Sequence, residues 1–204
     1  MRLLLVRHGL TDWNAAGRYQ GKTDIPLNDA GQQQAEALAK RLADVEIHAI
    51  YTSDLQRALQ TAQTIAAPHG CAAIPEPRLR EVSFGTWEGL TYDEIGQRDS
   101  AALKRWESRV LDVAPPGGES LIQVTTRVRP LLQGIQSRHI NKTALVVAHG
   151  GPLQILLCLA LGLSPEKHWQ FALAPASVSE VSFYPAGAIV NLLNDRSHLT
   201  GANL

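Results

Sequence analysis

Short apolar runs alternate along the chain with longer segments in which apolar residues recur every three or four positions. The runs predict buried strands, and the longer segments predict amphipathic helices. We expect strands at residues 3–6, 49–52, 72–74 and 144–148, and a closing antiparallel hairpin from strands at 178–184 and 189–193. This alternation predicts an α/β fold, a three-layer α/β/α sandwich whose sheet is mostly parallel with an antiparallel edge strand.

Residues that cap helix N-termini precede several of the periodic segments. Asn28 is a candidate N-cap, and Ser53, Thr91 and Ser120 each begin a capping-box pattern. Pro152 suits the first turn of a helix that is apolar on every side. We therefore expect a helix to begin at each of these positions.

The segment at about residues 76–118 departs from this alternation of strands and helices. It is rich in glycine and proline, and it holds Trp87 and Trp106. We expect a lid-like excursion of short helices beyond the sheet. The chain has 204 residues, a length that suits one domain, so residues 1–204 are predicted to form a single domain that carries this excursion.

Composition narrows the possible partners and the location. Nineteen basic residues balance nineteen acidic ones, so the basic surface that nucleic acid or an anionic membrane would need is absent as a bulk property. The N-terminal apolar run is too short for a signal peptide, and the later ones are too short for a bilayer. We expect a cytoplasmic protein with no nucleic-acid or membrane partner. Cys71 and Cys158 lie far apart and form neither a disulfide framework nor a zinc motif.

Two predicted strands end in the same way, with a histidine followed by glycine. These are His8 and His149, and Arg7 directly precedes the first. Ligands of open α/β sheets bind at the carboxyl ends of the strands. Arg57 follows the second strand by about one helical turn, and two guanidinium groups beside a helix N-terminus would bind a dianion such as phosphate. The pattern therefore predicts a phosphate site.

Simpler interpretations of these residues remain open. Arg57 could be a solvated charge on a helix, and either histidine alone could be structural. Metal binding by His8 and His149 is compatible with the composition, but no cluster of ligands supports it.

Motifs in family order along nearly the whole chain resemble the histidine phosphatase superfamily, the phosphoglycerate mutase-like clan. They are residues 5–14 (LVRHGLTDWN), 18–21 (RYQG), 24–28 (DIPLN), 51–58 (YTSDLQRA), 79–82 (LREV), 85–89 (GTWEG), 116–120 (PGGES) and 146–151 (VVAHGG).

The resemblance implies catalytic roles for five residues. His8 would be the nucleophile that forms a phosphohistidine, which splits one displacement into two. Arg7, Arg57 and a protonated His149 would hold the equatorial oxygens of the phosphoryl group, without a metal or any other cofactor. Glu81 would protonate the leaving oxygen and then accept a proton from water.

The resemblance also implies a set of substrate-binding residues around this core. Thr11 and Asn14 would add neutral hydrogen bonds to the phosphate, Gln20 and Gly21 would line the mouth of the pocket, and Gly150 would lie beside the phosphate.

Three functions compete within the resemblance. The first is a metal-independent phosphomonoesterase, of the histidine acid phosphatase type, that hydrolyses a small phosphorylated metabolite such as α-ribazole 5′-phosphate or phosphoserine. The second is a cofactor-dependent phosphoglycerate mutase, and the third is a non-catalytic binder of a phosphorylated ligand. Only about thirty residues separate Gly89 from Glu119, which favours the first, but Lys104, Arg105 and Arg109 could bind the carboxylate of a mutase substrate. We expect a monomer or a homodimer.

Overall fold

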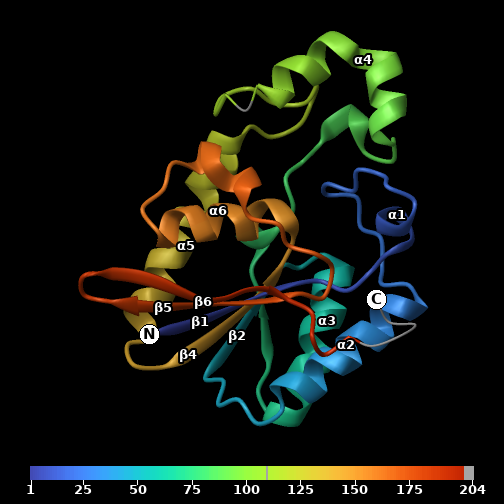
Figure 1. The fold of residues 1–204 in the computed structure, drawn as a ribbon. Helices are drawn as coiled ribbons and strands as arrows, with labels where there is room; N and C mark the ends of the chain where they lie inside the picture. Colours follow the sequence, from blue (N-terminus) through green and yellow to red (C-terminus); the bar gives the residue numbers. More distant parts are fainter. Residues whose placement is uncertain (109, 200–204) are drawn as a thin grey trace.

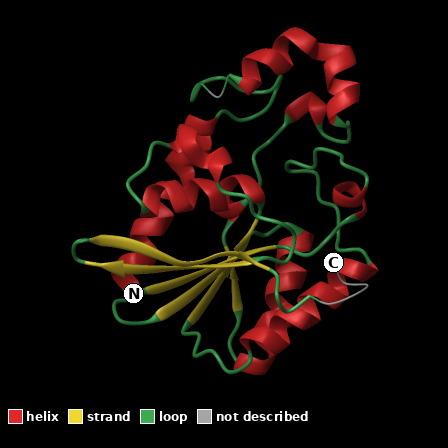
Figure 2. Ribbon diagram, in the orientation of Figure 1, coloured by secondary structure: helices red, strands yellow, loops and turns green. Residues whose placement is uncertain are grey.

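A six-stranded mixed sheet forms the centre of the fold (Figures 1 and 2), in a computed structural model that describes residues 1–108 and 110–199. The strand order is β3-β2-β4-β1-β5-β6. The strands are β1 (Arg2–Arg7), β2 (Ala49–Thr52), β3 (Ala73–Pro75), β4 (Thr143–Ala148), β5 (Val178–Tyr184) and β6 (Gly187–Asp195).

Four of the strands run parallel, and the other two close one side of the sheet. β3, β2, β4 and β1 pair in parallel, while β5 pairs antiparallel with β1 and β6 pairs antiparallel with β5. This confirms the predicted α/β fold and the predicted closing hairpin. Arg7 aligns with Ala148 on β4, and Val147 aligns with Thr52 on β2, so the carboxyl ends of these three strands meet at one edge.

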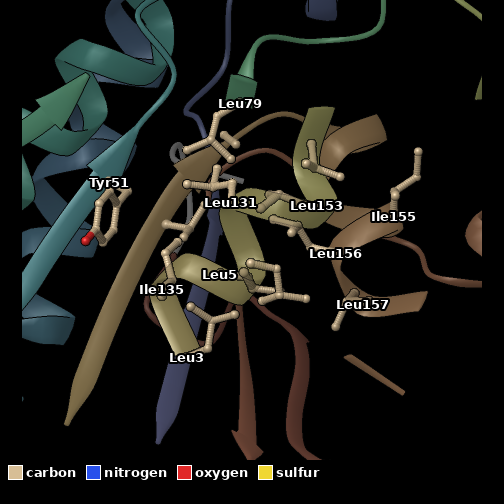
Figure 3. Close-up of a cluster of buried hydrophobic side chains, with 14 of the residues drawn as sticks. Leu3, Leu5, Tyr51, Leu79, Leu131, Ile135, Leu153, Ile155, Leu156 and Leu157 are labelled. Carbon is tan, nitrogen blue, oxygen red and sulfur yellow. The ribbon is translucent and has the colours of Figure 1, made fainter. Parts of the chain in front are cut away.

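Helices cover both faces of the sheet. α2 (Asp29–Leu42) and α3 (Gln56–Ala66) lie on one face, and α5 (Leu121–Arg138) and α6 (Gly150–Ala160) lie on the other (Figure 1). Successive side chains of β1 point to opposite faces, so Leu3 and Leu5 pack with α5 and α6 (Figure 3), whereas Leu4 and Val6 pack with α2 and α3. The two cores hold the strand ends in fixed positions.

The segment between β3 and α5 lies beyond the sheet. It holds two short 3₁₀ helices, η2 (Pro77–Leu79) and η3 (Gly85–Trp87), and then α4 (Tyr92–Glu107), which stands away from the other helices (Figure 1). Trp87 is fully buried against Ile95 and Leu103 of α4, and its Nε1 donates to Asp99 Oδ2 at 3.0 Å. Whether residues 1–204 form a single domain stays a prediction.

Three shorter elements complete the described chain. They are α1 (Asp12–Ala15), η1 (Ala67–His69) and η4 (Pro165–Gln170).

Three of the four predicted N-caps are formed as expected. Asn28 Oδ1 accepts from the Gly31 amide at 2.9 Å at the start of α2, and Thr91 and Ser120 form capping boxes at the starts of α4 and α5.

The capping box predicted at Ser53 is wrong. Helix α3 begins at Gln56, and its N-cap, Leu55, makes no side-chain capping bond. The Gln56 amide donates instead to Asp24 Oδ1 at 2.7 Å, while the Ser53 hydroxyl pairs with His149 at 2.8 Å and accepts from the Leu55 amide at 3.3 Å.

Candidate active site

Three polar side chains follow directly after the aligned strand ends. His8 follows β1, Ser53 follows β2 and His149 follows β4, and all three are buried. The rings of the two histidines lie 4.9 Å apart, edge to face. The fold therefore brings together the two histidines that the sequence placed 141 positions apart.

The His8 ring is held in one tautomer by the backbone. Its Nδ1 donates to the carbonyl oxygen of Gly9 at 2.7 Å, and because a carbonyl only accepts, the proton lies on Nδ1. Burial, with Arg57 and Arg7 nearby, holds the pKa of His8 well below its usual value. His8 is thus a neutral imidazole whose Nε2 carries a free lone pair.

His149 is likewise neutral in this arrangement, and the protonated ring expected beside a phosphate dianion stays a prediction. Arg57 Nε donates to His149 Nδ1 at 3.2 Å, so this nitrogen accepts, and Nε2 donates to Ser53 Oγ at 2.8 Å. Burial is the largest cause that lowers the pKa of His149, followed by the positive charge of Arg57. The physical reason is that a charged ring would be desolvated beside two guanidinium groups.

Arg57 is fixed by three acceptors. Besides the bond to His149, its Nη1 donates to the Thr23 carbonyl at 2.9 Å and its Nη2 donates to the Gly21 carbonyl at 2.8 Å. The side chain is 1% exposed, which excludes the solvated helix charge considered from the sequence. Each Nη atom keeps a second N–H, because guanidinium has five donors.

Arg7 has donors that the protein does not use. Its Nη1 donates to the Leu173 carbonyl at 2.6 Å, while its Nε is buried and has no partner among the described residues. Burial lowers the pKa of Arg7, and Glu81 partly opposes this effect. An unpaired, desolvated donor beside a second buried arginine favours binding of an anion.

Glu81 faces the arginines with one carboxylate oxygen held by amides. Its Oε1 accepts from the Val82 amide at 2.9 Å and from the Gly151 amide at 3.1 Å. A Cβ on Gly151 would lie 2.6 Å from this oxygen, so glycine is required for the close approach. No described protein group donates to Oε2.

A pocket of about 250 Å³ opens onto these groups. Its lining contains seven of the ten residues predicted for the site, with Gly17, Arg18, Tyr19 and Phe84 in addition; the seven are Arg7, His8, Asn14, Gln20, Gly21, Arg57 and Glu81. The other three are not lining residues; Thr11 and His149 are fully buried, and Gly150 is partly buried. The structure thus brings the predicted residues to one place, while their individual roles stay predictions.

Thr11 holds the pocket wall from behind. Its hydroxyl caps α1 by accepting from the Asn14 amide, and it also accepts from Gln20 Nε2 at 2.6 Å. These bonds orient Asn14 and Gln20, so Thr11 is placed to support the wall and not to reach into the pocket.

The basic residues considered for a mutase carboxylate lie elsewhere. Lys104 and Arg105 are exposed on α4 and do not line the pocket. Arg109 lies outside the described residues. Within the part of the chain that the structure describes, no three histidine, cysteine or acidic side chains gather as metal ligands, and no helix has the length and apolar character to cross a membrane.

Several positioning groups were missed by sequence reasoning. Ser53 orients His149, and Thr61 Oγ1 accepts from the Gly9 amide at 3.1 Å behind His8. Ser53 lies inside a motif that pointed to it, but Thr61 is one polar residue on a helix and gives no such signal. The carbonyl of Leu173 carries no side-chain signal at all.

The comparisons with known proteins agree with this geometry. The family model of the histidine phosphatase superfamily (branch 1) matches residues 3–196. The chain belongs to the histidine phosphatase superfamily. It is 35% identical over 199 residues to phosphoserine phosphatase 1 of Hydrogenobacter thermophilus, which covers 98% of this chain and 94% of that protein.

Two further relatives of this superfamily member carry different names. A protein named probable phosphoglycerate mutase GpmB, of Photorhabdus laumondii, is 36% identical over 98% of this chain and 95% of that protein. The solved structure of α-ribazole phosphatase from Shigella flexneri superposes with a TM-score of 0.87 at 29% identity, over 96% of this chain and 97% of that one. The superfamily and these relatives make the chain a phosphatase or a phosphomutase.

Proposed function

We propose that this histidine phosphatase superfamily member is a metal-independent phosphomonoesterase that works through a phosphohistidine on His8. The observation that carries the proposal is the tautomer of His8. The Gly9 carbonyl fixes the proton on Nδ1, and this leaves Nε2 as a neutral nucleophile in a buried pocket with two arginines.

The reaction takes two displacements. In the first, His8 Nε2 forms a bond to phosphorus, the bond from phosphorus to the ester oxygen breaks, and Glu81 gives its proton to that oxygen. In the second, Glu81 takes a proton from water, the water oxygen bonds to phosphorus, and the bond to Nε2 breaks. Phosphate leaves and both side chains return to their starting state.

The two arginines supply the electrostatic part of this mechanism. A phosphate monoester carries about −1.5 to −2 charges near pH 7. The unused donors of Arg7 and Arg57 would hold the equatorial oxygens, where negative charge must be stabilised in the transition state. A phosphate dianion would also favour the protonated form of His149.

The surroundings of the pocket favour a substrate with an aromatic group. Edge-to-face contacts join Tyr19 to Phe84 and Phe84 to Trp106, and this wall leads to a second pocket of about 150 Å³. Aromatic and aliphatic side chains line that pocket beside polar groups; its lining is Tyr19, Tyr92, Leu103, Trp106, Glu107, Val110, Leu121 and His168. We therefore rank α-ribazole 5′-phosphate, whose base is aromatic, above phosphoserine, whose leaving group is a zwitterion without an aromatic ring.

The first experiment compares leaving groups in the presence of excess EDTA. Wild type is expected to hydrolyse both 4-nitrophenyl phosphate and an alkyl phosphate. His8→Ala should lose turnover on both. Glu81→Gln should lose about 100-fold or more in kcat on the alkyl ester and far less on the activated aryl ester, which needs no protonation. Equal losses on both esters would contradict the acid role, and loss of activity in EDTA would contradict metal independence.

The alternative function is a mutase, and a second assay separates the two. It compares conversion of 3-phosphoglycerate to 2-phosphoglycerate, with the bisphosphate cofactor present, against phosphate release from α-ribazole 5′-phosphate and phosphoserine. We expect hydrolysis to dominate because Lys104 and Arg105 do not line the pocket. Faster isomerisation than hydrolysis would overturn the phosphatase assignment.

A further inference from the structure

Glu88 collects donors from two separate loops. Its Oε2 accepts from the Thr23 amide at 2.9 Å and from the Thr23 hydroxyl at 2.5 Å. Its Oε1 accepts from the Lys22 amide at 3.0 Å and from the Phe84 amide at 3.1 Å. The carboxylate therefore ties the loop at residues 21–23 to the loop at residues 83–88.

The first of these loops is the support of Arg57. The carbonyls of Gly21 and Thr23 accept from the two Nη atoms, and the Nε of the same guanidinium donates to His149. Glu88 does not line the pocket, so it has no contact with a ligand there. It reaches Arg57 through the loop backbone and also through its negative charge, which is among those that oppose the lowering of the Arg57 pKa by burial.

Local geometry keeps Glu88 in this place. Gly21 has a φ of +54°, and a Cβ there would lie 2.0 Å from Glu88 Oε1, so glycine leaves the room that the carboxylate fills. On the other side, the neighbouring Trp87 is fully buried and is fixed by its bond to Asp99. The buried Trp87 thus fixes the position of the Glu88 carboxylate, and the carboxylate in turn fixes the loop that carries the carbonyls of Gly21 and Thr23.

We propose that Glu88 is a positioning residue that sets Arg57 for phosphoryl binding through the backbone of residues 21–23. The test of this inference by turnover rests on the proposed function, whereas its test by phosphate binding does not. The negative charge of Glu88 contributes to this role. Four N–H or O–H donors from Lys22, Thr23 and Phe84 converge on its two oxygens, and the NH₂ group of a glutamine would point its own donors toward some of them.

The test is a double-mutant cycle that joins Glu88 to Arg57. Glu88→Gln should lower kcat/KM for 4-nitrophenyl phosphate by about 10- to 100-fold, the range seen when supporting partners of a site are removed. In an Arg57→Ala background the same change should cost less than about threefold, because residues that act as a unit are not additive. Glu76→Gln, in which a carboxylate bonded to Arg78 away from the pocket loses its charge, is the matched control and should change kcat/KM by less than about twofold.

Binding of inorganic phosphate, measured by calorimetry, separates this proposal from the proposed function. If the wild-type protein binds phosphate but does not hydrolyse an ester, the proposed function is refuted. The double-mutant cycle of Glu88→Gln and Arg57→Ala, measured as the Kd for phosphate, would still test the role of Glu88. Equal losses from Glu88→Gln in both backgrounds, or no loss in wild type, would overturn the positioning role. If Glu88→Gln does not fold, Thr23→Val removes one donor to the carboxylate and should show a smaller loss with the same non-additivity.

Discussion

Acidification is expected to destabilise this protein through its two active-site histidines. His8 and His149 are almost fully buried, and burial together with Arg57 and Arg7 holds the pKa of each well below its usual value. In the unfolded chain both rings titrate near pH 6.5. Below that pH the unfolded state binds more protons than the folded state, so the free energy of unfolding is highest above pH 6.5 and falls as the pH drops.

The size of this effect follows from the two protonation states. An imidazole that stays neutral in the folded protein and titrates near pH 6.5 when unfolded loses about 2 kcal/mol of stability between pH 7 and pH 5. Two such rings lose about 4 kcal/mol, a large part of the 5–15 kcal/mol that is typical of a whole domain. The ion-paired carboxyl groups with lowered pKa, such as Asp54 and Glu180, lose their contribution mainly below about pH 5.

The assay is urea unfolding at about pH 7 and about pH 5, in buffers without phosphate, because a bound anion would favour the protonated rings. His8→Asn and His149→Asn lower stability at every pH, so only the difference between the two pH values is compared. Each variant should reduce that difference by about 2 kcal/mol, and the double variant by about 4 kcal/mol. His139 and His198, whose pKa values burial also lowers, are present in all variants and cancel. A single variant with the same pH difference as wild type would refute the reasoning.

Two substitutions away from the nucleophile test the packing of the site and of the segment between β3 and α5. In Gly151→Ala, the new Cβ would lie 2.6 Å from Glu81 Oε1 and 2.5 Å from Val82 Cγ2, so it would displace the Glu81 carboxylate. Steady-state assays should therefore show a larger fall in kcat for alkyl than for aryl esters. Equal falls would mean that Glu81 is not displaced. Trp87→Phe should lower the urea unfolding free energy by about 1–3 kcal/mol, because it removes the 3.0 Å bond to Asp99 Oδ2 and leaves that part-buried oxygen only the 3.9 Å ion pair with Arg98; unchanged stability would show that Asp99 finds another donor.

The strands were predictable because their signal is local. The segments predicted at residues 49–52 and 178–184 match β2 and β5 to the residue, and the other strands differ by one or two positions at their ends. The central strands β2 and β4 are buried on both faces and need continuous apolar runs, whereas β5 mixes apolar with polar residues, and neither signal depends on which strand lies next to which. The order of the strands depends on long-range pairing, and the spacing of the runs does not determine it.

Capping was predictable only where nothing distant competed for the same hydroxyl. Thr91 and Ser120 cap their helices, and neither hydroxyl has a long-range hydrogen bond to another described residue. Ser53 carries the same pattern, but β2 and β4 align so that His149 lies beside it. Asp24 Oδ1 satisfies the Gln56 amide at the helix N-terminus, whereas the buried imidazole N–H of His149 finds its acceptor in the Ser53 hydroxyl.

The site divides into side chains that the sequence could indicate and backbone groups that it could not. The spacing of the residues and the motifs of the sequence indicate His8, Arg57 and Glu81 as reacting side chains. Their orientations, and that of Arg7, are set by the carbonyls of residues 9, 21, 23 and 173, which any residue would offer, and by the amide of residue 151, which any residue except proline would offer. The path of the loop determines which residues fit at these positions. Gly21 and Glu88 therefore affect Arg57, although neither contacts its guanidinium through a side chain. A pattern of residue types can therefore name the reacting groups, but only the folded loops show which of them are free to react.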